Sequence, residues 1–380
     1  NWLNEGEADA FVEIGDRTFG KKAQYAFSYD LSECWFSLTQ LPFVFAAWVS
    51  VVKLPQHFLS LFNEALAFGI NNRNELIESL AKELCWRDYF QRVAQVKDVQ
   101  EDLKFPQYDV LHDEIPSNIV SGATGIQGID QAIRDLYAHG YMHNHARMYT
   151  ASLVCNVAKS RWKLPSKWMY YHLLDGDFAS NACSWQWVAG SNSNKKYYAN
   201  QENINRYMST QQHGTFMDRS YESFESMSVP KELSATQVTS FPVNLPSHGE
   251  LKVDKNLPTF LYTYYNMDPT WHQGIDGNRI LMLEPSFFEQ YPVSDKCLDF
   301  LLKLGENIPG IQVYVGSFDE LLTEYGLSNC VFKEHPLTKH FQGISEPRDW
   351  ICPEVLGYYP SFFAYWKQVK KQLTSNIPTV

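Results

Sequence analysis

Polar and indole side chains crowd into otherwise apolar helical sequence midway along the chain, in YMHNHARMYTASLVCN, WMYYHLLDGDFASN and SWQWVAG. Asn144 and Arg147 are three residues apart, so a helix places them on one face. Asp175, Asp177 and Asn181 can line a second face. A guanidinium, an amide and two carboxylates that converge would suit a redox ring with polar edges. The spacing therefore predicts a buried cofactor in this part of the chain.

An ion pair between Arg147 and a carboxylate of the DGD sequence would fix the arginine and leave N–H donors for an anionic ligand. A reduced flavin carries such a negative charge. Asn181 follows Asp177 by one helical turn and offers an amide that can donate to or accept from the central nitrogen of a flavin. A buried ion pair and a helix-capping asparagine explain the same residues without a ligand. If the pair is fully buried, we expect Arg147→Ala to cost about 3–5 kcal/mol and to weaken flavin retention.

Tryptophans lie close in sequence to this polar set: Trp162, Trp168, Trp185 and Trp187. Indoles within stacking range of a flavin can supply electrons to it. Tryptophans at helical spacing are more often part of a packed core. The sequence leaves both interpretations open, an electron path and an aromatic core.

A second group of interest is ELCWRDYF, which places Glu83, Trp86 and Arg87 on or near one helical face. A carboxylate beside an exposed indole could receive and stack a nucleobase extruded from DNA. Such stacking is worth about 1–3 kcal/mol per base, comparable to the few kcal/mol needed to flip a damaged base. The alternative is an amphipathic helix with a Glu–Arg pair on its solvated side.

The histidines do not predict a metal site. His143 and His145 are two residues apart and point to different sides of a helix, and His335 and His340 read as a loop pair. GxSxG, HExxH and paired-cysteine signatures do not occur in the sequence, so hydrolase and structural-zinc functions have little support.

The sequence divides into three parts. Residues 1–75 read as an α/β segment, with FVEIGD as a short strand, and residues 76–250 are mainly helical and end in a polar connector from about residue 220. In residues 251–380, RILMLEP and IQVYVG read as buried strands on either side of the helical VSDKCLDFLLKLGENI, which predicts a βαβ unit and a parallel sheet. We expect the last helix, Ser361–Gln372, to cover one face of that sheet.

The composition limits the kinds of partner that the protein can bind. With 380 residues, 44% of them apolar, the chain can bury a large core, and its net charge of −11 means that any contact with DNA must come from one local face. Seven cysteines without a CxxC pair indicate reduced thiols and a cytoplasmic protein. The longest apolar run, Leu41–Val52, is too short to span a bilayer, so we expect no membrane span and no secretory signal. The sequence leaves the oligomeric state open, and we expect a monomer.

ELCWRDYF, TGIQGIDQAIRDLYAHGYMHNHARM and LLDGDFASNACSWQWVAG resemble the flavin-binding helical domain of the DNA photolyase and cryptochrome family, over about Glu83–Tyr198. The resemblance implies that FAD is contacted by Arg87, Asn144, Arg147, Asp175, Asp177 and Asn181. Arg147 would pair with Asp175 beneath the isoalloxazine, and Asn181 would lie beside its central nitrogen. Trp185 and Trp162 match the inner electron-transfer tryptophans. Glu83, Trp86 and Trp187 match positions that meet a damaged pyrimidine pair, where light-excited reduced flavin donates an electron, the cyclobutane ring splits and the electron returns.

The chain departs from the family pattern in three respects. No tryptophan occurs between Trp86 and Trp162, so the outermost member of the usual electron-transfer triad is missing, and Tyr108 is the nearest aromatic substitute. The α/β domain follows the helical domain instead of preceding it, which leaves the antenna chromophore open. The family's Thr/Ser-rich phosphate-binding stretch upstream of ELxWRDF has no counterpart.

IGDRTF, YDLSECW and LTQLPFVFAAW, within about residues 8–72, resemble instead the chorismate dehydratase of the futalosine route to menaquinone, with Gln40 where that family has glycine. These resemblances imply a mixed fold: a mainly α-helical, photolyase-type FAD-binding domain in residues 76–250, flanked by α/β segments in residues 1–75 and 251–380. Our first hypothesis is a FAD flavoprotein, a deoxyribodipyrimidine photo-lyase-like enzyme that uses blue light to repair pyrimidine dimers in damaged DNA. The alternatives are a cryptochrome-like or non-catalytic flavin-binding module, and a chorismate dehydratase-like protein.

Overall fold

The computed structural model describes residues 73–376, with side chains from residue 78 to residue 373. The chain divides into two compact units, residues 1–76 and residues 77–380. The strand and helix expected before residue 73, and with them the segment that resembles the dehydratase, lie outside the described residues. None of the helices within residues 73–376 has the length and apolar composition needed to cross a bilayer.

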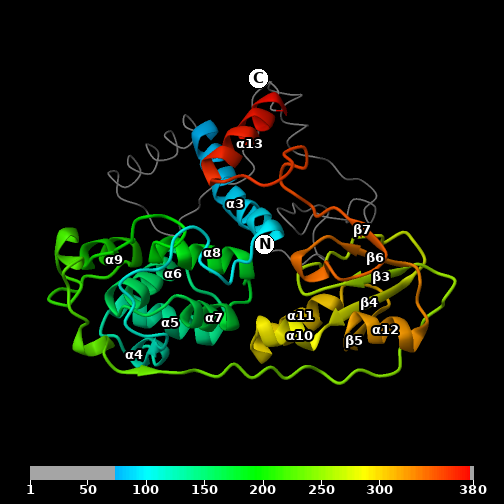
Figure 1. The fold of residues 1–380 in the computed structure, drawn as a ribbon, viewed down its shortest axis with the longest axis horizontal. Coiled ribbons are helices and arrows are strands. Elements are labelled where there is room, and N and C mark those ends of the chain that lie inside the picture. The colour runs from blue at the N-terminus through cyan, green and yellow to red at the C-terminus, as the bar shows by residue number, and fades with distance from the viewer. Residues whose placement is uncertain (1–72, 377–380) are drawn as a thin grey trace, which may run out of the picture. The chain divides into compact units, whose positions relative to one another are not determined.

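Helices dominate the first half of the described chain (Figure 1). They are α3 (Arg73–Val96), α4 (Ser117–Val120), α5 (Gln127–His139), α6 (Asn144–Ser152), α7 (Lys163–His172), α8 (Phe178–Ala189) and α9 (Gln201–Met208). Burial follows the helical period, as on α3, where Cys85, Tyr89 and Val93 recur every four residues and are buried. The helix expected from His145 onward is confirmed as α6, and a π-helical turn at Leu153–Val157 continues it.

Helix α8 begins at the DGD sequence because Asp177 is its N-cap. The Asp177 side chain accepts a hydrogen bond of 2.7 Å from the Ser180 backbone N–H, which satisfies one of the free donors of the first turn. The helix ends at Gly190, whose φ of 88° closes the last turn in a left-handed conformation suited to glycine. The sequence therefore fixes the start of α8 at the point where the predicted cofactor residues lie.

The connector after α9 runs mostly without regular structure. It is tied back to the helical part where β2 (Thr236–Gln237) pairs antiparallel with β1 (Ile115–Pro116). Short 3-10 turns at Tyr221–Phe224 and Lys231–Leu233 precede that pairing. Beyond it the chain runs to the first strand of the sheet (Figure 1).

The second half is a five-stranded, fully parallel sheet in the order β5-β4-β3-β6-β7. Its strands are β3 (Thr259–Tyr262), β4 (Asn278–Leu283), β5 (Ile311–Val315), β6 (Cys330–Lys333) and β7 (Ile344–Glu346), and its helices are α10 (Pro285–Gln290), α11 (Asp295–Gly305) and α12 (Phe318–Tyr325). The predicted βαβ unit is confirmed as β4, α11 and β5. Strand order reverses between β3 and β6, which is the point where doubly wound sheets usually bind ligands.

Aromatic side chains fill that reversal point and join it to the helices. Tyr265, just after β3, stacks on His335, just after β6, with ring centroids 4.9 Å apart. The Tyr265 hydroxyl lies 2.7 Å from the Tyr170 hydroxyl and accepts a hydrogen bond of 3.1 Å from the Phe178 N–H at the start of α8. Burial raises the pKa of both tyrosines well above the ordinary value, so both hydroxyls stay protonated. The carboxyl end of the sheet thus supports the first turn of α8.

The last helix, α13 (Phe362–Asn376), packs on α3 (Figure 1). Phe362 stacks on Trp86 with ring centroids 3.6 Å apart, and Tyr365 stacks on Tyr89 at 6.0 Å. The expectation that this helix covers a face of the sheet was wrong. Its apolar stripe required a partner, and the aromatic face of α3 supplies one.

Candidate functional site

The two carboxylates of the DGD sequence have different surroundings. Asp177 is 4% exposed and accepts hydrogen bonds from the Ser180 N–H and from Gln91 Nε2 of α3, the latter at 3.1 Å. Asp175 is 52% exposed and faces α6. Asp177 therefore holds the helix start together, and Asp175 is the carboxylate that remains accessible.

Arg147 and Asp175 form the ion pair expected from the sequence. Arg147 Nη2 donates to both oxygens of Asp175, at 2.9 and 2.8 Å, and Arg147 Nε donates to the Met142 carbonyl at 2.6 Å. The pair is not fully buried, because the arginine side chain is 24% exposed. The cost of 3–5 kcal/mol expected for a fully buried pair therefore does not apply, and about 0.2–1 kcal/mol is appropriate for a pair with this exposure. Asn144, at the first turn of α6, is exposed.

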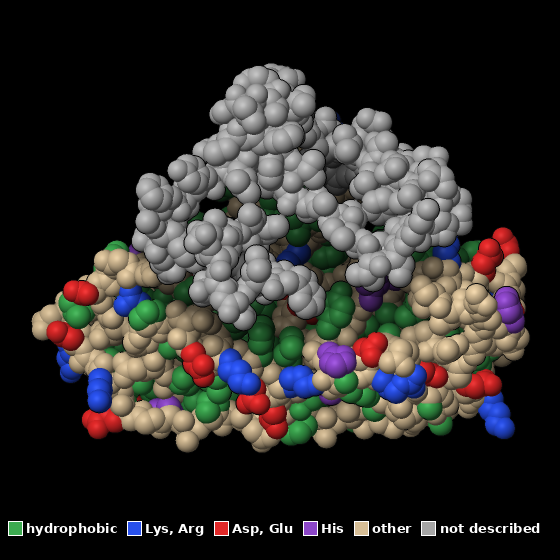
Figure 2. All heavy atoms as spheres, turned by 180° about the vertical axis from the view of Figure 1, so that it is seen from behind, with side chains coloured by type: hydrophobic (Ala, Val, Ile, Leu, Met, Phe, Trp, Pro, Cys, Tyr) green, Lys and Arg blue, Asp and Glu red, His purple; other side chains and the backbone are tan. Residues whose placement is uncertain are grey.

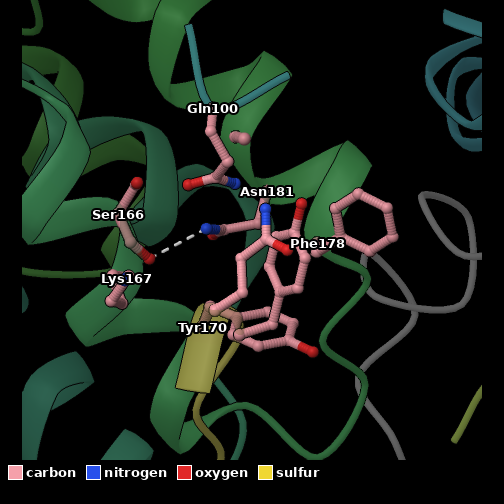
Figure 3. A pocket seen from close by; sticks show the side chains of 9 residues that line it. Gln100, Ser166, Lys167, Tyr170, Phe178 and Asn181 are labelled. Atoms are coloured by element: carbon pink, nitrogen blue, oxygen red, sulfur yellow. Dashed lines mark hydrogen bonds between the residues drawn. The ribbon is translucent and has the colours of Figure 1, made fainter. Parts of the chain in front are cut away.

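Asn181 lines a small pocket with a cavity volume of about 10 Å³ (Figure 3). Its Nδ2 donates to the Ser166 carbonyl at 2.8 Å, and Figure 3 shows its side chain beside that of Gln100. The lining residues are Gln100, Ser166, Lys167, Tyr170, Phe178, Asn181, Ala182, Gln290 and Tyr291. Burial lowers the pKa of Lys167. The pocket therefore combines an amide, aromatic rings and a desolvated amine.

A larger hollow, with a volume of about 290 Å³, shares Phe178, Gln290 and Tyr291 with the first pocket. Its other lining residues come from the end of α3, the loop after it and the turn after β6, and they include Lys97 and Lys339. The space beside Asn181 thus extends toward the carboxyl end of the sheet.

The tryptophans fall into two groups. Trp162 and Trp185 are buried, and Trp162 Nε1 donates to the Asp102 carboxylate at 2.7 Å. Trp168 is also buried, with its Nε1 bonded to the Tyr137 hydroxyl at 3.0 Å. Trp187 is 37% exposed and lies 5.4 Å from the Tyr197 ring. Three of the four therefore form part of the aromatic core, and Trp187 reaches solvent.

On α3, Glu83 and Arg87 are exposed, whereas Trp86 is half-buried under Phe362. The indole is therefore less open than the exposed ring expected from the sequence. The reason is α13, whose contact with α3 joins residues far apart in the chain.

The structure also brings in residues that the sequence did not single out. Gln91 follows Arg87 by four residues on α3 and reaches Asp177, a spacing that could have been read from the sequence. Gln100 and Tyr291 enter the pocket from loop and sheet segments, and Arg348 approaches Asp177 from the segment after β7. No local pattern connects these three to α8. Within residues 73–376 no group of histidine, cysteine, aspartate or glutamate side chains has the arrangement of a metal site.

A family model of the FAD-binding domain of DNA photolyase matches residues 79–237. The helical part of this chain is similar to a photolyase-type FAD-binding domain. The match confirms the resemblance expected from ELCWRDYF and LLDGDFASN. The cofactor of the matched domain is FAD. A second model, described as menaquinone biosynthesis, matches residues 2–108 and so confirms the second resemblance. The residues that this model matches overlap the beginning of the photolyase-type domain.

Known photolyases also resemble part of this chain. The deoxyribodipyrimidine photo-lyase of Streptomyces griseus is 34% identical over 125 residues, which cover 31% of this chain and 27% of that protein. The enzyme of Alkalihalophilus pseudofirmus is 26% identical over 195 residues, 50% of this chain and 39% of that protein. A crystal structure of archaeal photolyase from Sulfolobus tokodaii with two FAD molecules is 25% identical, with a TM-score of 0.31, over 34% of this chain and 32% of that one. The chain thus spans between about a quarter and two-fifths of the length of these two curated relatives.

The hydrogen-bonding side chains at the start of α8 suit the polar edge of a flavin ring. Ser180 Oγ is buried without a hydrogen-bond partner in the described part of the chain, next to Asn181, whose amide faces the pocket. The cavity beside Asn181 has a volume of about 10 Å³, which is room for about one water and not for a flavin ring. The chemistry of these residues therefore suits the polar edge of the ring, but the cavity at Asn181 does not accommodate the ring, and the adjoining hollow of about 290 Å³ lies just below the roughly 300–1,000 Å³ typical of small-molecule sites.

Proposed function

We propose that this protein is a photolyase-like FAD flavoprotein that uses blue light for electron transfer in the repair of pyrimidine dimers in DNA. The observation that carries the proposal is the position of the photolyase-type residues around one helix start. Arg147 is held by Asp175, and Asn181 lines the adjacent pocket. Both features lie within the region matched by the FAD-binding model.

Bound FAD would supply light absorption and one-electron chemistry. Arg147, fixed by Asp175 and the Met142 carbonyl, would orient the polar edge of the ring with its remaining N–H donors. Asn181 would donate to or accept from the central ring nitrogen. Asp177 would keep the first turn of α8 in place, and Asn144 and Arg87 would supply further contacts.

We assign the inner positions of an electron path to Trp185 and Trp162, which are buried. Tyr108, which is 53% exposed, is the proposed outer position in place of the missing tryptophan. The Lys196 ammonium lies 4.4 Å from the Tyr108 ring centroid, and burial raises the pKa of the phenol. A protonated phenol is harder to oxidise than an indole, so we expect slow photoreduction.

Damaged DNA is the proposed partner, with Glu83, Trp86 and Trp187 at the lesion. Glu83 and Trp187 are accessible, whereas Trp86 is covered by Phe362. On the face shown in Figure 2, acidic and basic side chains are interspersed instead of forming a basic stripe. The net charge of −11 restricts contact with DNA to one local face, and we propose that the protein acts as a monomer. Free, buried thiols at the six described cysteines agree with the proposal of a reducing, cytoplasmic compartment.

The test begins with the visible absorption spectrum of the purified protein, followed by incubation with dimer-containing DNA in the dark and under blue light. Light-dependent loss of dimers together with bound flavin is the expected result. Bound flavin with equal dimer content in lit and dark samples would support the cryptochrome-like or non-catalytic alternative. A protein that neither carries nor takes up FAD would contradict the proposal.

The match of residues 2–108 to a menaquinone-biosynthesis model favours one second candidate, a chorismate dehydratase-like activity. This activity would need no flavin. Incubation of the flavin-free protein with chorismate tests it, because water loss lowers the substrate mass by the mass of one water. Unchanged chorismate would remove this candidate.

A further inference from the structure

Trp162 donates its indole N–H to a carboxylate. Its Nε1 lies 2.7 Å from Asp102 Oδ1, although the indole itself is fully buried. Trp168 differs, because its Nε1 bonds to the Tyr137 hydroxyl at 3.0 Å, and that hydroxyl donates its own proton to the Val120 carbonyl at 2.6 Å. Of these two buried indoles, Trp162 is the one whose acceptor carries a negative charge.

The loop that carries Asp102 is fixed against Trp162 and against α8. The Gln107 backbone N–H donates to Asp102 Oδ2 at 3.1 Å, and Gln107 Oε1 accepts the Trp162 backbone N–H at 2.9 Å. The Leu103 backbone N–H donates to Gln186 Oε1 of α8 at 2.8 Å. The carboxylate is therefore held in position before any charge develops on the indole.

The cations beside Trp162 in sequence do not neutralise this carboxylate. Arg161 and Lys163 are paired with other carboxylates, at 2.8 and 2.7 Å. Both donors to Asp102 described above are neutral N–H groups. Asp102 therefore keeps its charge beside the indole and remains able to accept a proton.

Loss of an electron from Trp162 would create a positive charge in a buried site, which is costly without a counter-charge. A carboxylate oxygen 2.7 Å from the indole nitrogen supplies that counter-charge. An oxidised indole is also a far stronger acid than a neutral one, so its shared proton is drawn toward the oxygen. The contact thus favours both electron loss and proton transfer.

We infer that Asp102 is the proton acceptor for Trp162 when this indole is oxidised. A one-electron acceptor takes an electron from the indole, the Nε1–H bond breaks, and an O–H bond forms at Asp102 Oδ1. The products are a neutral indolyl radical and a neutral carboxylic acid, so no charge remains at the buried site. When the electron returns, the proton goes back to Nε1.

This role for Asp102 rests on the proposed function, which places Trp162 in an electron path. A neutral radical at Trp162 would outlast a cation radical, because it carries no charge that draws the electron back. Slow electron donation from the outer position, Tyr108, would then have time to occur.

The test uses the flavin-free protein with a ruthenium(III) polypyridyl complex, made by a laser flash and a quencher, as the electron acceptor. The cation and neutral radicals of indole absorb in different visible bands, so transient absorption follows the proton transfer. Asp102→Asn keeps an amide oxygen that can accept the indole N–H but cannot take its proton, and Asp102→Glu keeps a base. Trp162→Phe identifies the signal of this indole. Glu101→Gln is the control, because Glu101 is the adjacent carboxylate and is 69% exposed.

In the wild type we expect rapid conversion of the Trp162 cation radical to the neutral radical. Asp102→Asn should slow this conversion by about 100-fold or more, as for the loss of a positioned base. Asp102→Glu should recover part of the rate, and Glu101→Gln should match the wild type. Equal rates in the wild type and Asp102→Asn would overturn the inference, as would a signal that is unchanged in Trp162→Phe.

Thermal unfolding of each flavin-free variant shows whether it is folded at the temperature of the test. A purely structural role of Asp102 would change the unfolding midpoint but not the kind of radical that forms. If Asp102→Asn does not fold, the wild type in D₂O decides. Transfer of a deuteron from Nε1 should slow the conversion, and an equal rate in D₂O and H₂O would overturn the inference.

None of these measurements requires bound FAD. A protein that does not take up FAD would therefore contradict the proposed function, while the radical spectra alone decide the role of Asp102.

Discussion

Two ion pairs of the same residue types distinguish the α3–α13 interface from the turn before α8. Asp88 and Arg92 lie 3.0 Å apart and each is 5% exposed. Arg147 and Asp175 lie 2.8 Å apart, but the carboxylate is 52% exposed. Breaking a buried pair leaves a charge without compensation, whereas an exposed charge is rescued by water. The difference indicates that the first pair stabilises the fold and that the second remains available to a ligand.

The largest expected effect is at the buried pair. We expect Asp88→Ala to lower the free energy of unfolding by about 3–5 kcal/mol, because Arg92 would stay buried without its carboxylate. Urea denaturation measures the change. Asp113→Ala is the matched control, since Asp113 pairs with Arg161 at 2.8 Å but is 79% exposed, and its effect should stay below about 1 kcal/mol. Similar losses in both variants would remove the contrast.

A second test concerns the aromatic contact of the same interface. Phe362→Ala should cost about 3–5 kcal/mol, because Phe362 is buried against Trp86. Phe363→Ala is the control, because Phe363 is 70% exposed and its removal should change stability by about 0.5 kcal/mol or less. An unaffected Phe362→Ala variant would show that α13 does not stabilise α3.

Acid should weaken the region of the second ion pair. His172, three residues before Asp175, has its pKa lowered to about 4 by burial, with a smaller effect of the nearby Lys296. The folded protein therefore holds this imidazole neutral. Its contribution to the free energy of unfolding is complete above pH 6.5 and is lost as the pH falls toward 4. The slope is about 1.4 kcal/mol per pH unit for one proton taken up on unfolding. His172→Gln should reduce the slope of unfolding free energy against pH, and an unchanged slope would refute the assignment.

The smallest effect on stability is expected at Arg147. Arg147→Ala should lower the unfolding free energy of the flavin-free protein by only about 0.2–1 kcal/mol, yet it should reduce flavin retention markedly. Absorbance at the flavin bands after gel filtration measures retention, and Arg161→Ala provides an exposed-arginine control. Undiminished flavin in Arg147→Ala would contradict the role proposed for this pair.

Local pattern accounts for what the sequence predicted. The strands β4 and β5 were predictable because each is a short apolar run next to a helix with a clear apolar stripe, and a βαβ connection implies parallel pairing. The Arg147–Asp175 pair followed from residue types within a family pattern.

Long-range contacts account for what the sequence did not predict. The stripe of α13 signals that a partner exists but not which one, so the contact with α3 and the covering of Trp86 were missed. Arg348 lies in an irregular segment whose approach to Asp177 depends on how the whole sheet docks. No spacing rule reports such a placement.

The pairing of β1 with β2 has a consequence for how the two halves stay together. It anchors the connector to the helices at Gln237, the Tyr171 hydroxyl anchors it again at the Pro242 carbonyl, and Asn244 already bonds to Asp295 of α11, so the free connection between the two halves is very short. A short connection keeps the sheet at a high effective concentration beside α8. Even a weak contact, such as the hydrogen bond from the Phe178 N–H to the Tyr265 hydroxyl, therefore stays formed. Cleavage of the chain at one point in that connection would turn the contact between the two halves into an intermolecular one. Whether the two fragments then separate on dilution would measure the intrinsic affinity of the sheet for the helices.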